Sequence, residues 1–126
     1  MHISVAIPRD PRAPARGRRL VERLRGHVAA EIVPDAKLLV SELITNSVKY
    51  GSEDQVTLKL DTTGPRSLRV ELLDGGPEFV PAPRTRPSTD VGGWGLHLVR
   101  VLSDRWGVRT SPTTVWFEID AHPRAA

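Results

Sequence analysis

Apolar and polar residues alternate with a period of two in five short stretches of the chain. Such alternation places apolar side chains on one face of a β-strand and polar side chains on the other. The five predicted strands cover residues 2–7, 55–62, 68–73, 108–111 and 114–120. Pro8 ends the first strand, which we expect at a sheet edge, and turns at Gly64-Pro65 and Pro112 separate the two later pairs.

Apolar residues recur at helical spacing in three other stretches, which predict helices over residues 13–32, 34–50 and 93–103. The first stretch has its inward positions at Leu20, Val21, Leu24, Val28 and Ile32. Pro34 fits the first turn of the second helix, and Gly51 follows its end. The order of elements is therefore β-α-α-β-β-loop-α-β-β. It predicts an α+β fold, a two-layer α/β sandwich in which helices cover one face of a mostly antiparallel sheet.

The length of 126 residues predicts one domain, residues 1–126, with a single core. Residues 77–92 contain four prolines and few apolar residues, and we expect them to form a mobile loop. The absence of cysteine excludes disulfides, cysteine zinc sites and thiol nucleophiles. No apolar run approaches the ~20 residues of a membrane helix, and the N-terminus lacks a signal-peptide pattern. We therefore expect a cytoplasmic protein without membrane association.

Positive charge gathers at the N-terminal end of the chain. Residues 1–25 contain seven arginines and two acidic residues, whereas the whole chain has a net charge of +3. A basic segment can meet nucleic acid or an acidic protein surface, or it can simply be a solvated helix face. No base-reading motif or aromatic stacking platform accompanies these arginines, which disfavours direct nucleic-acid binding.

A polar stripe runs along the second predicted helix. At about 100° per residue, Glu42, Asn46 and Lys49 fall within about 60° of one another, beside the apolar face. The amide oxygen of Asn46 suits Mg²⁺, which prefers hard oxygen ligands. Glu42 could orient a water or accept a hydroxyl proton, and Lys49 could reach a phosphate. The alternative for these three residues is a solvated helix face.

Two glycine-containing segments could approach a ligand closely. Asp74 ends a predicted strand and precedes two glycines, and its carboxylate could accept from an exocyclic amine such as that of adenine. The alternative is a plain Asp-Gly turn. Gly92-Gly93-Trp94-Gly95 precedes a predicted helix, so its amides could bind an anion. This spacing matches neither the P-loop nor a full dinucleotide fingerprint.

Taken together and in this order, these segments resemble the motifs of the GHKL ATPases (gyrase, heat-shock chaperone, histidine kinase and mismatch-repair type). The chain is most similar to the small anti-sigma-factor serine/threonine kinases of that superfamily. The matches are Glu42-Leu43-x-x-Asn46-x-x-Lys49-Tyr50 to the N box, Asp74-x-Gly76-Pro77 to the first glycine box, and Gly93-x-Gly95-Leu96 to the second. Residues 102–108 and 114–118 resemble the family's closing segments. The resemblance implies the Bergerat-type ATP-binding fold, with ATP and Mg²⁺ as ligands.

The same resemblance implies a role for each matching residue. Asn46 would bind Mg²⁺ and Glu42 would be the catalytic carboxylate. Asp74 would receive the adenine amine, with Gly76 beside the ring and Thr114 near adenine through water. The remaining nucleotide-binding positions would be Lys49, Gly93, Trp94, Gly95 and Leu96 at the phosphates. Residues 78–92 would form the lid over ATP.

The implied activity is phosphorylation of a serine or threonine on a small anti-anti-sigma protein, together with sequestration of a sigma factor. A homodimer is implied in the same way. Glu78 stands where the first glycine box often has a further glycine, and the lid is short, with only Arg84 and Arg86 as cations. The alternative is therefore a nucleotide-binding regulatory module that sequesters a partner without catalysis.

Overall fold

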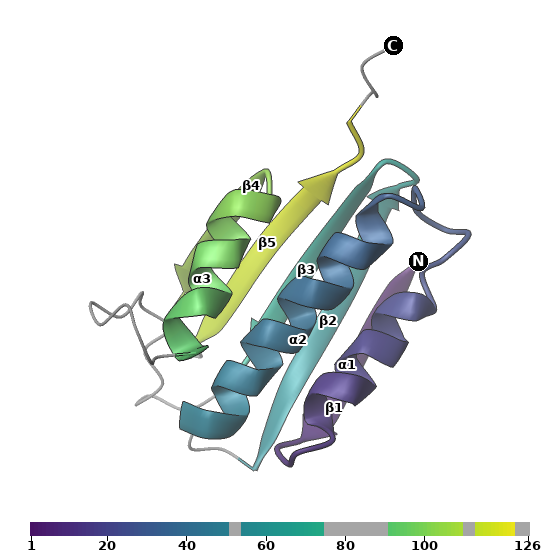
Figure 1. The fold of residues 1–126 in the computed structure, drawn as a ribbon. Helices are drawn as coiled ribbons and strands as arrows, with labels where there is room; N and C mark the ends of the chain where they lie inside the picture. Colours follow the sequence, from purple (N-terminus) through teal and green to yellow (C-terminus); the bar gives the residue numbers. More distant parts are fainter. Residues whose placement is uncertain (51–53, 75–90, 110–112, 123–126) are drawn as a thin grey trace.

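The computed structural model describes residues 1–50, 54–74, 91–109 and 113–122, and it confirms the predicted fold class (Figure 1). Five antiparallel strands pair in the order β1-β2-β3-β5-β4. The strands are β1 (His2–Pro8), β2 (Gln55–Gly64), β3 (Ser67–Leu73), β4 (Arg105–Arg109) and β5 (Thr114–Asp120). The helices α1 (Ala13–Glu22), α2 (Ile32–Tyr50) and α3 (Val91–Leu102) cover one face of the sheet. The predicted edge strand at the N-terminus lies at one edge, as β1.

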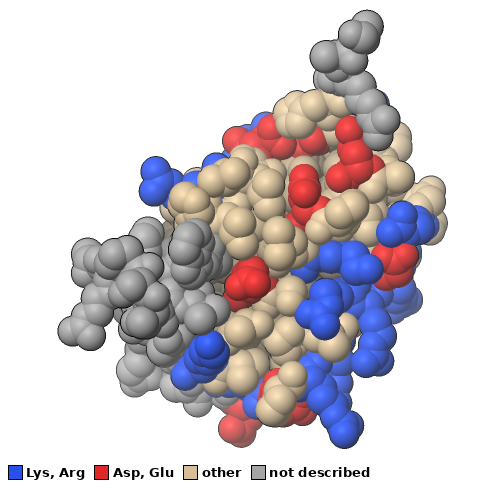
Figure 2. Space-filling view, viewed as in Figure 1, with Lys and Arg blue, Asp and Glu red and all other residues tan. Residues whose placement is uncertain are grey.

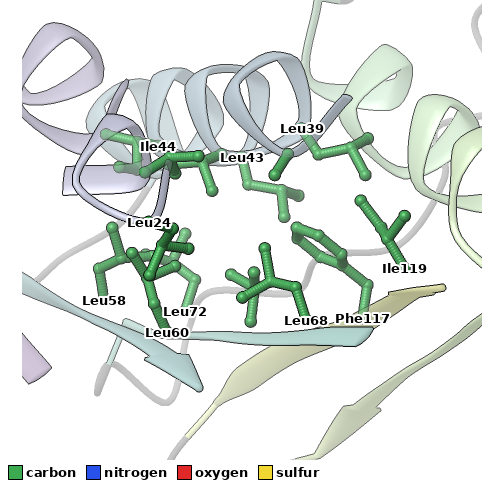
Figure 3. Packing of buried hydrophobic residues seen from close by; sticks show 14 of the residues in the cluster. Leu24, Leu39, Leu43, Ile44, Leu58, Leu60, Leu68, Leu72, Phe117 and Ile119 are labelled. Atoms are coloured by element: carbon green, nitrogen blue, oxygen red, sulfur yellow. The ribbon is translucent and has the colours of Figure 1, made fainter. Parts of the chain in front are cut away.

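The core lies between the helices and the sheet. Alternate residues of each central strand point toward the helices, as the period-two pattern predicts. Figure 3 shows Phe117, Leu68 and Leu72 rising from the sheet toward Leu39 and Leu43 of α2, and all five are almost fully buried. Because α2 lies between α1 and α3, it covers the centre of the sheet and carries the largest share of the helical core (Figure 1).

The predicted helix over residues 13–32 was wrong in its second half. α1 ends at Glu22, and the chain passes through Gly26, whose φ of 90° lies in the left-handed region that favours glycine. Leu24 and Val28 are nevertheless buried, at 0% and 6% exposure, from within the connection to α2. Their apolar spacing thus predicted burial correctly, but the helix ends at Glu22, and the left-handed conformation of Gly26 is incompatible with one continuous helix through this stretch.

α1 crosses α2 closely at Gly17. A Cβ atom at this position would lie 2.8 Å from Cγ1 of Val40 and closer still to Cδ1 of Ile44. Glycine at a helix interior costs about 1 kcal/mol in helix propensity, and here it permits the two helices to approach. This contact fixes α1 beside α2, above the edge strand β1.

The sheet face opposite the helices carries a network of charged side chains. Its ion pairs join Arg69, Arg105 and Arg109 with Glu71, Glu118 and Asp120 at 2.6 to 3.2 Å. The guanidinium of Arg69 also lies 4.4 Å from the ring centre of Trp116, a cation–π contact. Gly107 lies under that ring, since a Cβ atom there would come within 2.7 Å of the indole Nε1.

Several element boundaries differ from the prediction. β4 begins at Arg105, three residues before the predicted start, and α3 begins at Val91 rather than at residue 93. The predicted lid over residues 78–92 lies outside the described residues, apart from its last two, which belong to α3. In the described part of the chain, no helix is long and apolar enough to span a membrane. The extent of the domain, residues 1–126, stays a prediction.

Candidate functional site

The polar stripe of α2 lies on the helix that covers the centre of the sheet. Asn46 is buried at 6% exposure, Glu42 is half-buried and Lys49 is exposed. The three side chains therefore span the range from the core to solvent along one helix. A buried amide beside a half-buried carboxylate on an otherwise apolar helix side is a costly arrangement unless the polar groups have partners.

Asp74 lies at the end of β3, directly below the helix layer. Its residue parity matches that of the buried Val70 and Leu72, so its side chain faces the helices, and its exposure is 3%. Its backbone N–H donates to the carbonyl oxygen of Thr113 at 3.0 Å. Thr114 begins β5, is 2% exposed and pairs with Leu73 across the sheet. The fold therefore brings two predicted site residues, Asp74 and Thr114, to neighbouring positions.

One oxygen of the Asp74 carboxylate is held by two donors. Oδ2 lies 2.8 Å from Nη2 of Arg9 in a buried ion pair whose side chains are 8% and 2% exposed. The hydroxyl of Ser47 donates to the same oxygen at 2.5 Å. Arg9 Nη2 also lies 3.4 Å from Ser47 Oγ. Asp74 is thereby tied both to α2 and to the segment that follows β1.

The other oxygen of the same carboxylate has no partner in the described part of the chain. Oδ1 of Asp74 is buried and accepts no hydrogen bond within the described residues, and the same is true of Nε of Arg9 as a donor. A buried acceptor without a donor costs about 1–3 kcal/mol. A ligand N–H placed at Oδ1 would remove that cost, and the exocyclic amine of adenine is such a donor.

The glycine segment does not precede a helix, because α3 begins at Val91, two residues before the predicted start at residue 93. Gly93, Trp94, Gly95 and Leu96 all lie within the first half of α3. Glycine disfavours a helix by only about 1 kcal/mol, and α3 packs on the core through the buried Val99. Gly76, the remaining glycine of the predicted site, lies outside the described residues.

The side-chain amide oxygen of Asn46 could serve as one ligand of a magnesium ion. Among the residues that the structure describes, no three His, Asp or Glu side chains gather closely enough to hold a metal ion. Mg²⁺ often keeps several waters and takes phosphate oxygens as ligands. The amide of Asn46 fits an ion of that kind, bound together with a nucleotide.

Sequence reasoning missed two members of this site, Arg9 and Ser47. Ser47 adjoins Asn46 in the predicted stripe but received no role. Arg9 was counted among the basic residues of the N-terminal end, although a signal for its burial was present. It continues the inward series Ile3, Val5 and Ile7 at a spacing of two, which predicts that its side chain turns toward the helix layer.

Comparison with known proteins gives one family and a related fold. The model of the family described as "Histidine kinase-like ATPase domain" matches residues 7–119. No curated protein matches the chain. A crystal structure of the RsbU and RsbW domains of Rv1364c from Mycobacterium tuberculosis is similar in fold, with a TM-score of 0.72 at 16% identity. The similarity covers 95% of this chain but only 32% of that one, so the chain spans about a third of its length.

Proposed function

Because the chain belongs to the histidine kinase-like ATPase family, we propose that it binds ATP with Mg²⁺ and phosphorylates a protein serine or threonine. The acceptor would be a small anti-anti-sigma protein, and the same chain would sequester a sigma factor as an anti-sigma factor regulating transcription. The observation that carries nucleotide binding is Oδ1 of Asp74, beside Thr114, which is buried and has no hydrogen-bond partner among the described residues. It is an acceptor removed from water to which this part of the chain supplies no donor.

Each side chain of the site has a part in this proposal. Asp74 would accept a hydrogen bond from the amine of adenine. Asn46 would supply an oxygen ligand to Mg²⁺, which would neutralise charge on the phosphates. Glu42 takes the proton of the attacking hydroxyl group of the acceptor serine or threonine. The oxygen of that hydroxyl group bonds to the γ-phosphorus, and the bond between the γ-phosphorus and the β,γ-bridging oxygen breaks to leave ADP. Lys49, exposed at the end of α2, reaches the phosphates as a point charge. Phosphoryl transfer depends chiefly on such positioning and charge neutralisation.

The test has two stages. Calorimetry first measures binding of ATP with and without Mg²⁺, and transfer of radiolabel from ATP to candidate antagonist proteins is then followed on gels. Glu42→Ala should keep ATP binding but abolish transfer, and Asn46→Ala should lose the Mg²⁺-dependent part of binding. Glu31→Ala, an exposed glutamate just before α2, serves as the matched control and should change neither.

The outcomes separate the proposal from its alternative. No ATP binding by the unmodified protein would refute the nucleotide site. Binding without label transfer to any antagonist would instead favour a regulatory module that sequesters its partner without catalysis. Equal loss of binding in the Glu42 and Asn46 variants would assign the stripe a structural role.

The arginine face of α1, which we define as Arg16 and Arg19 of the helix together with Arg23 directly after its end, supports the proposed protein partner. Figure 2 shows basic side chains gathered over the region where α1 lies in Figure 1. The three arginines line a groove of about 490 Å³ whose other walls are residues 5–8 of β1 and Leu20. Arg16 pairs with Asp10 at 3.3 Å, whereas Arg19 and Arg23 are exposed. An acidic protein surface complements this face.

Charge reversal tests the docking face directly. Arg19→Glu with Arg23→Glu should slow association with the partner at low salt, because complementary charge chiefly raises association rates. Arg66→Glu with Arg100→Glu changes the net charge equally at exposed positions elsewhere and should leave the rate unchanged. Surface plasmon resonance at two salt concentrations measures both. Unchanged association of the α1 variant, or tight duplex-DNA binding at physiological salt, would contradict this assignment.

The proposed homodimer is tested by light scattering of the purified protein.

A further inference from the structure

Arg9 holds the carboxylate of Asp74 from the side away from its unpartnered oxygen. We infer that Arg9 is a positioning residue. It orients Asp74 so that Oδ1 can accept a hydrogen bond from the amine of a 6-aminopurine, and it thereby determines the selectivity of the site for adenine over other purines. The inference rests on the proposed function, that this site binds ATP. Arg9 would not touch the base itself, but act through Asp74.

The first step in the argument is geometric. The carboxylate group is planar and rigid, so when one of its oxygens is held in place, the position of the other oxygen is restricted as well. Oδ2 of Asp74 is held by Arg9 at 2.8 Å and by Ser47 at 2.5 Å, and these donors come from different elements. The two donors also contact each other, since Nη2 of Arg9 lies 3.4 Å from Oγ of Ser47. The carboxylate is therefore held in one orientation, and none of the described residues donates to Oδ1.

The second step concerns charge. A carboxylate at 2% side-chain exposure needs a compensating charge or strong hydrogen bonds. Arg9 supplies the charge, and the two hydrogens on its Nη2 can donate to the Ser47 hydroxyl and to the carboxylate at once. The side chain of lysine is one bond shorter than that of arginine, so a lysine ammonium at this position would keep the charge but lie farther from Oδ2.

The third step concerns the anchor of Arg9 itself. Its backbone N–H donates to the carbonyl oxygen of Asp54 at 2.8 Å, just beyond the β1–β2 pairing. The main chain of Arg9 is thus an extension of the sheet edge rather than part of α1. The side chain reaches the carboxylate from a fixed backbone, as a positioning role requires.

The chemistry predicts which bases the clamp distinguishes. Adenine presents an amine that donates to Oδ1, whereas guanine presents a carbonyl oxygen at the same ring position, which would face an acceptor with an acceptor. Unsubstituted purine has neither group. A hydrogen bond to a charged acceptor changes affinity by roughly tenfold to a hundredfold. That factor should depend on Arg9, while contacts to sugar and phosphates should not.

The test compares ATP with purine ribonucleoside triphosphate, which lacks the amine, by calorimetry on the full chain. In the unmodified protein ATP should bind at least about tenfold more tightly. Arg9→Met should shrink that ratio to about twofold by weakening ATP alone, and Arg9→Met combined with Asp74→Asn should have the same ratio as Asp74→Asn. Arg12→Met, an exposed arginine three residues later, is the matched control and should keep the full ratio.

If Arg9 has a purely structural role, Arg9→Met should lower the melting temperature but leave the ratio of the two nucleotide affinities unchanged. That result overturns the inference. Should Arg9→Met fail to fold, Arg9→Lys carries the test: it should reduce the ratio by about threefold, and an unchanged ratio overturns the inference as well. If the unmodified protein binds neither nucleotide, the proposed function fails. If it binds ATP with the same ratio in every Arg9 variant, only the role of Arg9 fails.

Discussion

Replacing Asp74 by asparagine tests how much the buried ion pair contributes to stability. The side chain keeps its size but loses its charge, and the Arg9 guanidinium, in a side chain only 8% exposed, loses its counter-ion. Breaking a buried pair by removing one partner typically costs about 3–5 kcal/mol. The asparagine oxygen can still accept one hydrogen bond from Arg9 or Ser47, which offsets about 1 kcal/mol. We therefore expect the free energy of unfolding to fall by about 2–4 kcal/mol.

Urea unfolding followed by circular dichroism measures this loss, with the same substitution at an exposed ion pair as the control. Asp10 accepts from Arg16 at 3.3 Å, and the two side chains are 39% and 36% exposed. Asp10→Asn should cost less than about 1 kcal/mol. Asparagine can also keep the hydrogen bond that Asp10 Oδ1 accepts from the backbone N–H of Arg12 at 2.8 Å.

A saturating nucleotide extends the same experiment to the site. ATP at about one hundred times its dissociation constant should stabilise the unmodified protein by about 2.7 kcal/mol. Asp74→Asn should lose most of this increment, because an amide must be oriented correctly to accept from the base, whereas Asp10→Asn should keep it. Equal unfolding free energies for the two variants without nucleotide would refute the burial argument. An unchanged ATP increment in Asp74→Asn would refute its role in binding.

Two further predictions concern the sheet face opposite the helices. Gly107→Ala should lower the unfolding free energy by about 1–3 kcal/mol, since its Cβ would overlap the Trp116 ring. Gly64→Ala, with no atom within 4 Å of the added carbon, should be nearly neutral in the same urea titration, and equal effects would contradict the packing described. The hydrogen bond from Arg105 lowers the pKa of Glu118 below its ordinary 4.5. Stability from this pair should be present above about pH 4.5 and be lost as the pH falls through the lower folded-state pKa. The urea midpoint should therefore fall less between pH 6 and pH 3 in Glu118→Gln than in the unmodified protein, and parallel curves would contradict this.

Much of the fold could be predicted from the chain because each strand has one buried face. Apolar residues alternate in the predicted strands over residues 55–62 and 68–73, and in the structure Leu58, Leu60, Leu68 and Val70 are all fully buried. The helix boundaries were less predictable. The spacing of Leu24 and Val28 is the same whether they lie on a helix or on a connection that packs against the same core.

The candidate site divides in the same way. Asn46 and Asp74 could be singled out because each carries its chemistry within a short local motif. The fold then buried both, and it placed Thr114 next to Asp74 through the pairing of β3 with β5. The predicted helix began at residue 93, whereas α3 begins at Val91, and packing of the whole helix outweighs the weak helix propensity of its glycines.

The sequence by itself determined the elements, their buried faces and the family, because periodicity and short motifs are properties of neighbouring residues. Only the tertiary structure decided which distant side chains pair with the carboxylate of Asp74 and donate hydrogen bonds to it. Arg9 and Ser47 reach it because the residue after β1 and the helix α2 both lie close to the end of β3, and no local pattern specifies that meeting. A buried carboxylate takes whichever donors the packing brings within reach. Among the described residues two side chains, Arg9 and Ser47, donate to this carboxylate, and both contact Oδ2, so Oδ1 has no partner there.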